Sequence, residues 1–266
     1  MTEWELIKAH DLCLSKKKIM IFLDFDNVLN SDYEFELKYK FPDSRTEYSF
    51  PFQPKLTEVF CQFMDEFPES EIVICSTWRN SYNNQYSHSN SIALHEFDKK
   101  SQSLLRNLEE HKEKSLEFIH KLINESGNYF RYAPNIVGVT PDIHGRFSEY
   151  IEKRTEIEKY IEFCVENPDD YLFIIIDDHS PDSMIPDIAN KYPFIHVMPW
   201  KNAEGKYMGF RKSLSDALVS FLKGNYNMNN PFYELRIAMN YMFDTYTIHY
   251  LPNKTDYKSL PPDFRD

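Results

Sequence analysis

The chain has 266 residues, of which 42% are hydrophobic and 16% aromatic, so it can bury a sizeable core and is not a wholly disordered protein. Its net charge of −12 disfavours broad, non-specific binding to nucleic acid without excluding a local basic groove. Every apolar run is well short of the ~18 residues of a membrane span, and Met1–His10 lacks the apolar segment of a secretory signal peptide.

The first predicted element is a buried strand. Residues Ile19–Leu23 are continuously apolar, follow the basic run Lys16–Lys18 and end at Asp24, which is typical of a parallel-sheet strand covered on both faces. Residues Tyr33–Phe41 instead alternate between apolar and charged side chains, which predicts a strand with one apolar face. Residues Thr46–Phe50 follow a turn signal and are predicted to return beside it as a hairpin.

Strands and helices alternate through the rest of the chain. This alternation is typical of an α/β fold in which helices flank a parallel, Rossmann-like sheet. The predicted helices are Pro54–Phe67, Ser148–Val165 and Ser213–Leu222, with a mostly helical segment at Ile92–Ile123, and the predicted strands are Glu71–Cys75, Asn135–Thr140, Tyr171–Ile176 and Phe194–Met198.

The chain divides into a core and a tail. Residues 1–224 are predicted to form the α/β core, with a small flap at 31–52 and an inserted helical segment at 80–130. Residues 225–266 are rich in Asn, Tyr and Pro, and are predicted to form an appendage of unknown role. One amphipathic helix is predicted in this appendage, near Phe232–Phe243.

Acids and hydroxyls follow three of the predicted strands. Because the carboxyl ends of parallel strands meet at one edge of a sheet, we expect these groups to converge there. Several carboxylates cannot all stay ionised together without a cation, and Mg²⁺ suits such oxygen ligands when a phosphate is also bound. Each pair taken alone is more simply a turn or helix-capping feature. The groups are Asp24 and Asp26 after the first strand, Ser76 and Thr77 after the second, and Asp177 and Asp178 after Tyr171–Ile176.

The order of these motifs resembles that of the haloacid dehalogenase (HAD) superfamily. Its four motifs are matched by Ile21–Leu29, by Ile72–Ser76, by Lys153 ahead of Glu156, and by Phe173–Asp178. The stretches Ser76–Arg79, Gly138–Pro141 and Lys153–Ile157 further resemble a subgroup of HAD domains associated with RNA-repair proteins. The resemblance extends over residues 17–224 and implies a Rossmann-like HAD core.

The resemblance also implies a phosphatase mechanism. Asp24 would be the nucleophile that forms an aspartyl-phosphate, while Asp26 would protonate the leaving oxygen and then activate water. Mg²⁺ would be held by the Asp24 carboxylate, the Asp26 backbone carbonyl and an acid of the fourth motif. Asp178 is the preferred direct ligand, with Asp177 binding directly or through water.

Two further residues would contact the phosphate. Ser76 would donate a hydrogen bond to a phosphoryl oxygen, with Thr77 as the alternative donor. Lys153 would offset the charge of the phosphorylated intermediate, with Arg154 as the alternative. Trp78 is interpreted as a packing residue rather than a platform for a base.

The aromatic hairpin at Tyr33–Phe50 lies where this superfamily carries a flap over the active site. A flap lined by Tyr33 and Phe35 would exclude water and favour an aryl leaving group. In the alternative interpretation these side chains only cover the edge of the sheet. Together with Asn27 and Thr77, Tyr33 and Phe35 are the predicted substrate contacts. No large cap domain fits between the first two motifs, so the site is expected to admit macromolecules.

Three functions follow from this sequence. The first is a Mg²⁺-dependent protein phosphatase acting on phosphotyrosine or another aryl phosphate, with a phosphoprotein as its partner. The second is a nucleic-acid end-processing or nucleotide phosphatase, which the RNA-repair resemblance favours and the charge of −12 disfavours. The third is a binding module that uses a HAD scaffold.

The cysteines bear on the compartment. The chain has four cysteines without a CxxC pairing, which indicates reduced thiols and a cytoplasmic location. An exported effector without a cleavable signal peptide is the alternative.

Overall fold

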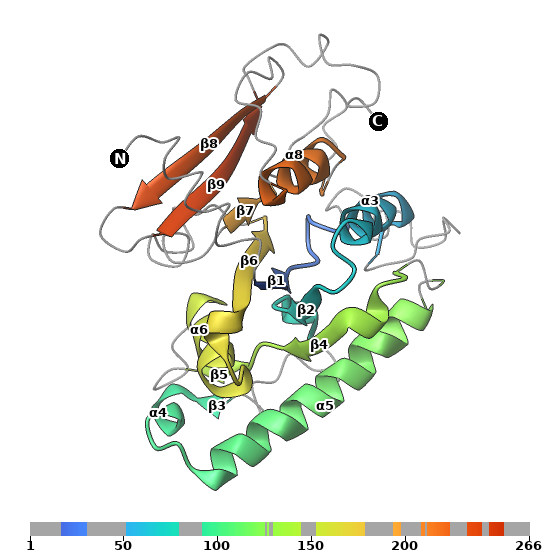
Figure 1. Ribbon diagram of the computed structural model, residues 1–266. Helices are drawn as coiled ribbons and strands as arrows, with labels where there is room; N and C mark the ends of the chain where they lie inside the picture. Colours follow the sequence, from blue (N-terminus) through green and yellow to red (C-terminus); the bar gives the residue numbers. More distant parts are fainter. Residues whose placement is uncertain are drawn as a thin grey trace.

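The computed structural model describes residues 17–30, 52–79, 92–125, 127, 130–144, 153–178, 194–197, 209–210, 212–223, 233–240 and 245–252 (Figure 1). The hairpin predicted at Tyr33–Phe50 lies outside these residues, together with nearly all of the flap predicted at 31–52.

A mostly parallel sheet forms the centre of the molecule. In the described part of the chain its strands are β1 (Lys18–Leu23), β2 (Glu71–Ile74), β4 (Ile136–Val139), β6 (Tyr171–Asp177), β7 (Phe194–His196), β8 (Tyr233–Asn240) and β9 (Thr245–Pro252). They lie in the order β4-β2-β1-β6-β7-β9-β8. All neighbours are parallel except β8 and β9, which are antiparallel. The predicted α/β fold with a parallel, Rossmann-like sheet is confirmed.

β1 lies between β2 and β6, and its side chains are enclosed on both faces. Ile21, Phe22 and Leu23 are fully buried. Leu23 pairs with Ile74 of β2 on one side and with Ile176 of β6 on the other. The three strands therefore reach the same edge of the sheet together, and the residue that follows each strand lies at that edge.

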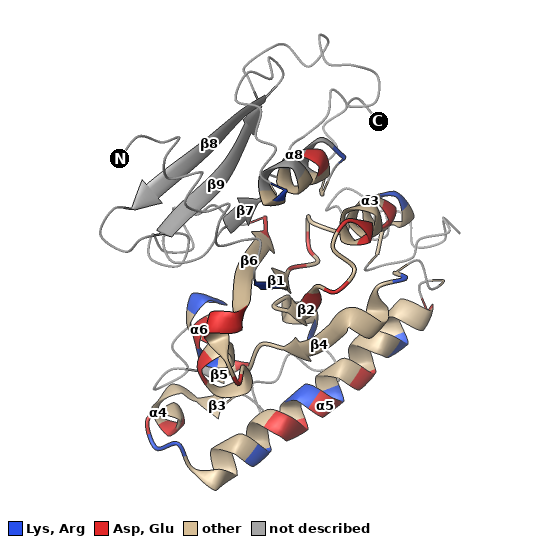
Figure 2. Ribbon diagram, viewed as in Figure 1, with Lys and Arg blue, Asp and Glu red and all other residues tan. Residues whose placement is uncertain are grey.

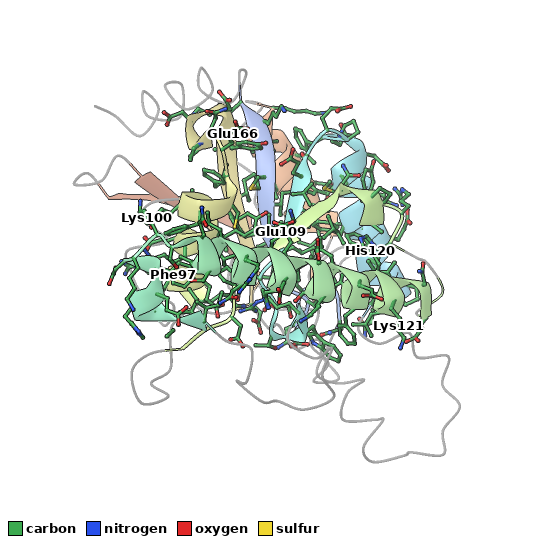
Figure 3. The ribbon with its side chains drawn as sticks, turned by 90° about the horizontal axis from the view of Figure 1, so that it is seen from below. Phe97, Lys100, Glu109, His120, Lys121 and Glu166 are labelled. Atoms are coloured by element: carbon green, nitrogen blue, oxygen red, sulfur yellow. The ribbon has the colours of Figure 1, made fainter. Side chains whose placement is uncertain are left out.

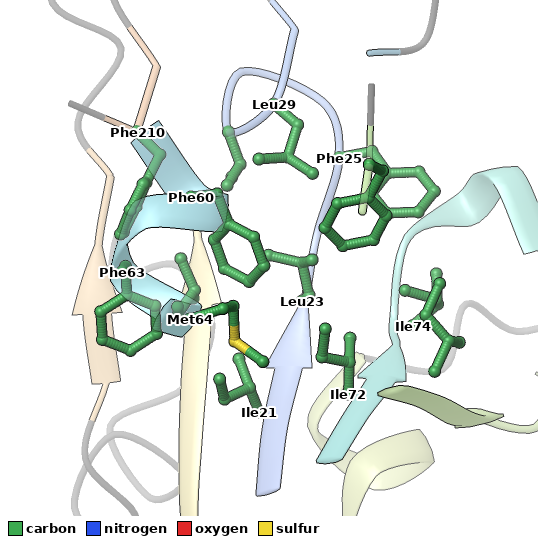
Figure 4. Packing of buried hydrophobic residues seen from close by; sticks show 14 of the residues in the cluster. Ile21, Leu23, Phe25, Leu29, Phe60, Phe63, Met64, Ile72, Ile74 and Phe210 are labelled. Atoms are coloured by element: carbon green, nitrogen blue, oxygen red, sulfur yellow. The ribbon is translucent and has the colours of Figure 1, made fainter. Parts of the chain in front are cut away.

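Helices cover both faces of the sheet. α3 (Pro54–Asp65), α5 (Gln102–Glu125) and α8 (Lys212–Leu222) contribute to the core on one face, and α6 (Lys153–Cys164) contributes on the other. Ile21 and Leu23 of β1 pack with Phe60 of α3 (Figure 4). Phe22, between them, faces the other way and meets Tyr160 of α6 edge-on, with ring centroids 5.8 Å apart. Burial on both faces explains why β1 is continuously apolar.

The segment predicted to be mostly helical at Ile92–Ile123 forms α4 (Leu94–Phe97) and α5. The first two residues of the segment form the short strand β3 (Ile92–Ala93), which pairs with β5 (Ile143–His144) in a separate two-stranded sheet. α5 contacts two cores: Ile119 joins the main core, whereas Leu104 packs in a smaller cluster near α4. The helix therefore ties the small sheet to the main domain.

The outward face of α5 carries charges of both signs (Figures 2 and 3). Lys112 pairs with Glu109 at 3.7 Å, and Lys121 pairs with Glu125 at the same distance. Basic residues therefore do not form a continuous positive surface on this face.

The helices in the described part of the chain are too short or too polar to span a membrane.

The helix predicted near Phe232–Phe243 is wrong, because these residues contain the strand β8. Leu235, Ile237 and Met239 also fit a period of two, so the apolar pattern alone is ambiguous between the two structures. The later segment β9 decides the outcome, since it pairs with β8 along its whole length. β9 in turn lies parallel to β7, so the tail extends the main sheet.

Candidate active site

The carboxyl ends of β1, β2, β4 and β6 are held together by backbone hydrogen bonds that continue past the strands. The amide of Asp24 donates to the carbonyl of Ile176 at 3.0 Å, and the amide of Thr140 donates to that of Ile74 at 2.9 Å. These bonds fix the backbone where the predicted acids and hydroxyls begin. The site thus stands on the most buried part of the sheet, which favours a precise geometry.

Three acids meet at this edge. Asp24 and Asp177 are buried, with exposed fractions of 3% and 0%, and Asp178 is half-buried. One carboxylate oxygen from each lies within 4.8 Å of the others. The expected convergence of the first and fourth motifs is therefore present. A set of hard oxygen donors at this spacing fits Mg²⁺, whereas the absence of sulfur and nitrogen donors from the trio disfavours softer metals.

Lys153, at the start of α6, reaches into the acidic trio. Its Nζ lies 2.6 Å from an oxygen of Asp177 and 3.1 Å from one of Asp24, and its side chain is only 11% exposed. The alternative residue Arg154 instead pairs with Glu158 on the same helix, at 3.5 Å. Lys153 is thus the basic residue that the structure brings to the site.

The charges in this cluster are unbalanced. Burial raises the pKa of Asp24 to about 6; Lys153 opposes this shift and Asp177 and Asp178 reinforce it. Burial alone would lower the pKa of Lys153, but Asp177 and Asp24 hold it well above its ordinary value. One ammonium faces three carboxyl groups, so a divalent cation would relieve the repulsion that remains.

Asp26 lies in the turn after β1, and its carboxylate is held from two sides. Its Oδ1 accepts a hydrogen bond from Trp78 Nε1 at 2.9 Å and another from Asn30 Nδ2 at 3.1 Å. The packing interpretation of Trp78 is therefore incomplete: the ring does pack against the main core, but its N–H is directed to Asp26. The Asn30 contact lies within the turn after β1, whereas the Trp78 contact joins two separate turns and does not follow from sequence spacing.

Asn27 links the first motif to the fourth. It has a positive φ of 55°, in the left-handed region that asparagine tolerates better than most residues. Its Nδ2 donates to Asp178 Oδ2 at 2.8 Å, and its backbone amide donates to Asn30 Oδ1 at 3.0 Å. The structure thus places the side chain of Asn27 on a carboxylate of the acidic trio. The predicted substrate contact of Asn27 stays a prediction.

The two candidate phosphate donors differ in their surroundings. Ser76 is fully buried, and its Oγ has no hydrogen-bond partner among the described residues. Thr77 is exposed. A buried hydroxyl gains from a hydrogen-bond acceptor, so Ser76 Oγ is a better candidate than the exposed Thr77 for donating to a bound oxygen. Tyr33 and Phe35, the other predicted substrate contacts, lie outside the described residues.

Arg79, to which the sequence assigned no role, is buried and connects the strand ends next to the site. Its guanidinium donates to the carbonyls of Cys75 at 3.0 Å, Ser76 at 2.7 Å and Thr140 at 3.0 Å. It also forms a buried ion pair with Glu156 at 2.5 Å. Glu156 lies one helical turn after Lys153, the lysine that contacts the acidic trio. The signal in the sequence was an arginine in the short turn after a buried strand, where a surface residue would have been the simpler expectation.

Comparison with known proteins agrees with this arrangement. The model of one family, described as the HAD domain in Swiss Army Knife RNA repair proteins, matches residues 20–198. No match was found among curated proteins or among solved structures. The matched range runs from β1 to β7 and includes every residue of the acidic trio, together with the residues that hold Asp26 and Ser76 in place. The chain therefore belongs to the HAD superfamily, in the family of HAD domains of Swiss Army Knife RNA repair proteins.

Proposed function

We propose that the protein is a Mg²⁺-dependent phosphomonoester hydrolase that works through an aspartyl-phosphate on Asp24. The observation that carries this proposal is the trio of Asp24, Asp177 and Asp178 around the ammonium of Lys153. HAD-family membership supports phosphatase-type chemistry. A phosphomonoester resists attack because its negative charge repels nucleophiles, so the site must combine a positioned nucleophile with positive charge.

The cation would be held by carboxylates of the trio and by the backbone carbonyl of Asp26. Asp177 already bonds to Lys153 at 2.6 Å, which supports Asp178 as the more direct ligand. When bound, Mg²⁺ supplies positive charge that offsets the charge of the phosphoryl group. Lys153 adds a fixed positive charge beside Asp24, with its Nζ 3.1 Å from the carboxylate.

The residues divide the reaction into two steps. In the first, an Asp24 oxygen forms a bond to phosphorus, the ester P–O bond breaks, and Asp26 gives its proton to the leaving oxygen. In the second, Asp26 takes a proton from water, the water oxygen bonds to phosphorus, and the bond to Asp24 breaks to release phosphate. Ser76 donates its hydroxyl proton to a phosphoryl oxygen, which would satisfy the otherwise unpaired Oγ.

A phosphate at an RNA end is the substrate class that we propose first. The support is the family description, which names RNA repair. The protein phosphatase prediction depended on the aromatic residues Tyr33 and Phe35, which lie outside the described residues. It therefore remains the second candidate, as an aryl-phosphate or phosphotyrosine hydrolase. A binding module without catalysis is the weakest of the three candidate functions, because the acids, the lysine and the serine expected of a phosphatase are all present.

Turnover of p-nitrophenyl phosphate tests the chemistry. We expect Mg²⁺-dependent hydrolysis that chelation abolishes, and a loss of at least about 1000-fold in Asp24→Asn, because the nucleophile is removed. Asp216→Asn is the matched control, since Asp216 is an exposed acid paired with Lys212 at 3.0 Å. Turnover that is equal in Asp24→Asn and wild type would contradict the proposed function.

A second assay separates the substrate classes. A 3′-phosphorylated RNA oligonucleotide and a phosphotyrosine peptide are compared at matched concentrations by release of phosphate. A higher kcat/KM for the oligonucleotide, falling steeply with salt, supports the RNA-end substrate. A higher kcat/KM for the peptide supports the protein phosphatase instead.

A further inference from the structure

Two side-chain N–H groups from separate segments bond to the same oxygen of Asp26. Trp78 and Asn30 both donate to Oδ1, at 2.9 Å and 3.1 Å. In the part of the chain that the structure describes, no hydrogen bond to Oδ2 is found. An N–H group can donate only to an oxygen lone pair, so a carboxyl group held in this way is left to carry its proton on Oδ2.

We propose that Trp78 is a positioning residue that orients Asp26 for proton transfer to the leaving group. This inference rests on the proposed phosphatase function. Trp78 does not touch the phosphoryl group in this account. It acts through Asp26 by fixing the plane of the carboxyl group and by directing Oδ2 rather than Oδ1 to the ester oxygen.

The position of Trp78 is fixed by its neighbours. The residue lies in a short turn directly after Ser76, which the amide of Arg79 closes by donating to the carbonyl of Ser76 at 3.2 Å. The guanidinium of Arg79 donates to the same carbonyl at 2.7 Å. The indole ring packs against the main core and is partly buried. A pinned turn and a packed ring leave the indole N–H little freedom to turn away from Asp26.

Asn30 holds the same carboxylate from the other side. It is 3% exposed, and its Oδ1 accepts the backbone amide of Asn27 at 3.0 Å while its Nδ2 donates to Asp26. The orientation of this amide is thus set by the turn after β1. Two donors fixed by different segments make the rotation of Asp26 out of its plane unfavourable, which a single flexible partner would not achieve.

In the alternative interpretation, the hydrogen bond only satisfies the partly buried indole N–H and has no role in the reaction, as is usual for buried tryptophans. The two interpretations differ in the substrates they affect. A general acid matters most for a poor leaving group such as an alkoxide, and little for p-nitrophenolate, which leaves without a proton. A purely structural defect lowers the turnover of both esters alike.

The experiment compares kcat/KM for two esters, glycerol 2-phosphate and p-nitrophenyl phosphate, because kcat/KM reports the first chemical step. Trp78→Phe removes the N–H and keeps an aromatic ring. Tyr132→Phe is the matched control: it removes one aromatic donor bond, 2.7 Å to the exposed acid Asp65, on another part of the surface. Thermal melting is recorded for each variant.

We expect Trp78→Phe to lower kcat/KM by about tenfold or more for glycerol 2-phosphate and by less than about twofold for p-nitrophenyl phosphate. Tyr132→Phe is expected to leave both values unchanged. Equal losses on the two esters, or no loss on either, would overturn the role of Trp78. Turnover that survives in Asp24→Asn would instead overturn the proposed function itself.

A spectroscopic readout tests the contact without turnover. In ¹⁵N-labelled protein without added Mg²⁺, the indole N–H resonance of Trp78 is assigned by its loss in Trp78→Phe. We expect this resonance to move when Asp26→Ala removes the acceptor. A resonance that stays in place in Asp26→Ala would contradict the hydrogen bond on which the inference depends.

Discussion

At the scale of single residues, the burial of Asp24 is unfavourable for its ionised carboxylate, which is the form that the proposed function needs. Its carboxyl group is buried beside two other acids, so its pKa is raised to about 6 although Lys153 lies 3.1 Å away. A surface aspartate would show no such conflict. The fold thus holds a carboxyl group that gains from a cation, which is the condition that metal-assisted phosphoryl transfer requires.

Binding of Mg²⁺ is expected to depend on pH through this carboxyl group. Above pH ~6 Asp24 is ionised and the affinity should be nearly level, whereas below it one proton must leave for each ion bound. We therefore predict a loss of about tenfold in affinity for each pH unit below this value. Isothermal titration calorimetry between pH 5 and pH 8 measures it. An affinity that stays level over the whole range would exclude Asp24 from the ligands.

At the scale of elements, the site depends on a clamp beneath it. Arg79 joins the ends of β2 and β4 to α6 through three carbonyls and the ion pair with Glu156. Burial raises the pKa of Glu156 even with Arg79 beside it. The clamp thus ties Ser76, whose carbonyl it binds, to the helix that carries Lys153.

Breaking this clamp is expected to destabilise the fold. Arg79→Met leaves Glu156 without its ion-pair partner and removes the guanidinium hydrogen bonds to three carbonyls, so we predict a loss of about 3 kcal/mol or more in the free energy of unfolding. Glu156→Gln keeps an acceptor for Arg79 and should lose less, about 1–2 kcal/mol. Urea denaturation measures both. A loss below about 1 kcal/mol in Arg79→Met would contradict the role of the clamp.

The buried strands could be predicted from the sequence, whereas the contacts between turns could not. β1, β2 and β6 are buried on both faces, as their short apolar runs rich in Ile and Val indicated, and the meeting of Asp24 with Asp177 followed from parallel strand order. Lys153 was placed by family resemblance alone. The bond between Trp78 and Asp26 joins turns 52 residues apart, and nothing in the local pattern encodes it.

At the scale of the whole molecule, the two described strands of the tail, β8 and β9, extend the main sheet. β9 lies beside β7, and β8 forms the outer edge in the described residues. The local pattern of the tail suited either structure, and only the pairing between two distant segments decided it. The acidic trio lies at the ends of β1 and β6, and in the sheet β7 separates these strands from the strands of the tail.

Truncation after Lys223 is expected to lower stability more than chemistry. It removes β8 and β9 and leaves the edge of β7 unpaired, which favours self-association. We predict a lower melting temperature and concentration-dependent aggregation, with the Asp24-dependent turnover of the remaining monomer retained. Light scattering and thermal melting measure these changes. A truncated protein that stays monomeric and melts like the full chain would contradict a structural role for the tail.

Phosphorylation of Asp24 itself tests the central claim most directly. The protein is mixed with ³²P-labelled p-nitrophenyl phosphate, whose leaving group needs no proton, and with Mg²⁺. The mixture is quenched in acid within the first turnover and mapped by proteolysis. The account predicts label on the peptide that contains Asp24, more of it in Asp26→Asn because the group that activates water is removed, and none in Asp24→Asn. Rapid phosphate release without label on this peptide, or label that persists in Asp24→Asn, would contradict the covalent role of Asp24.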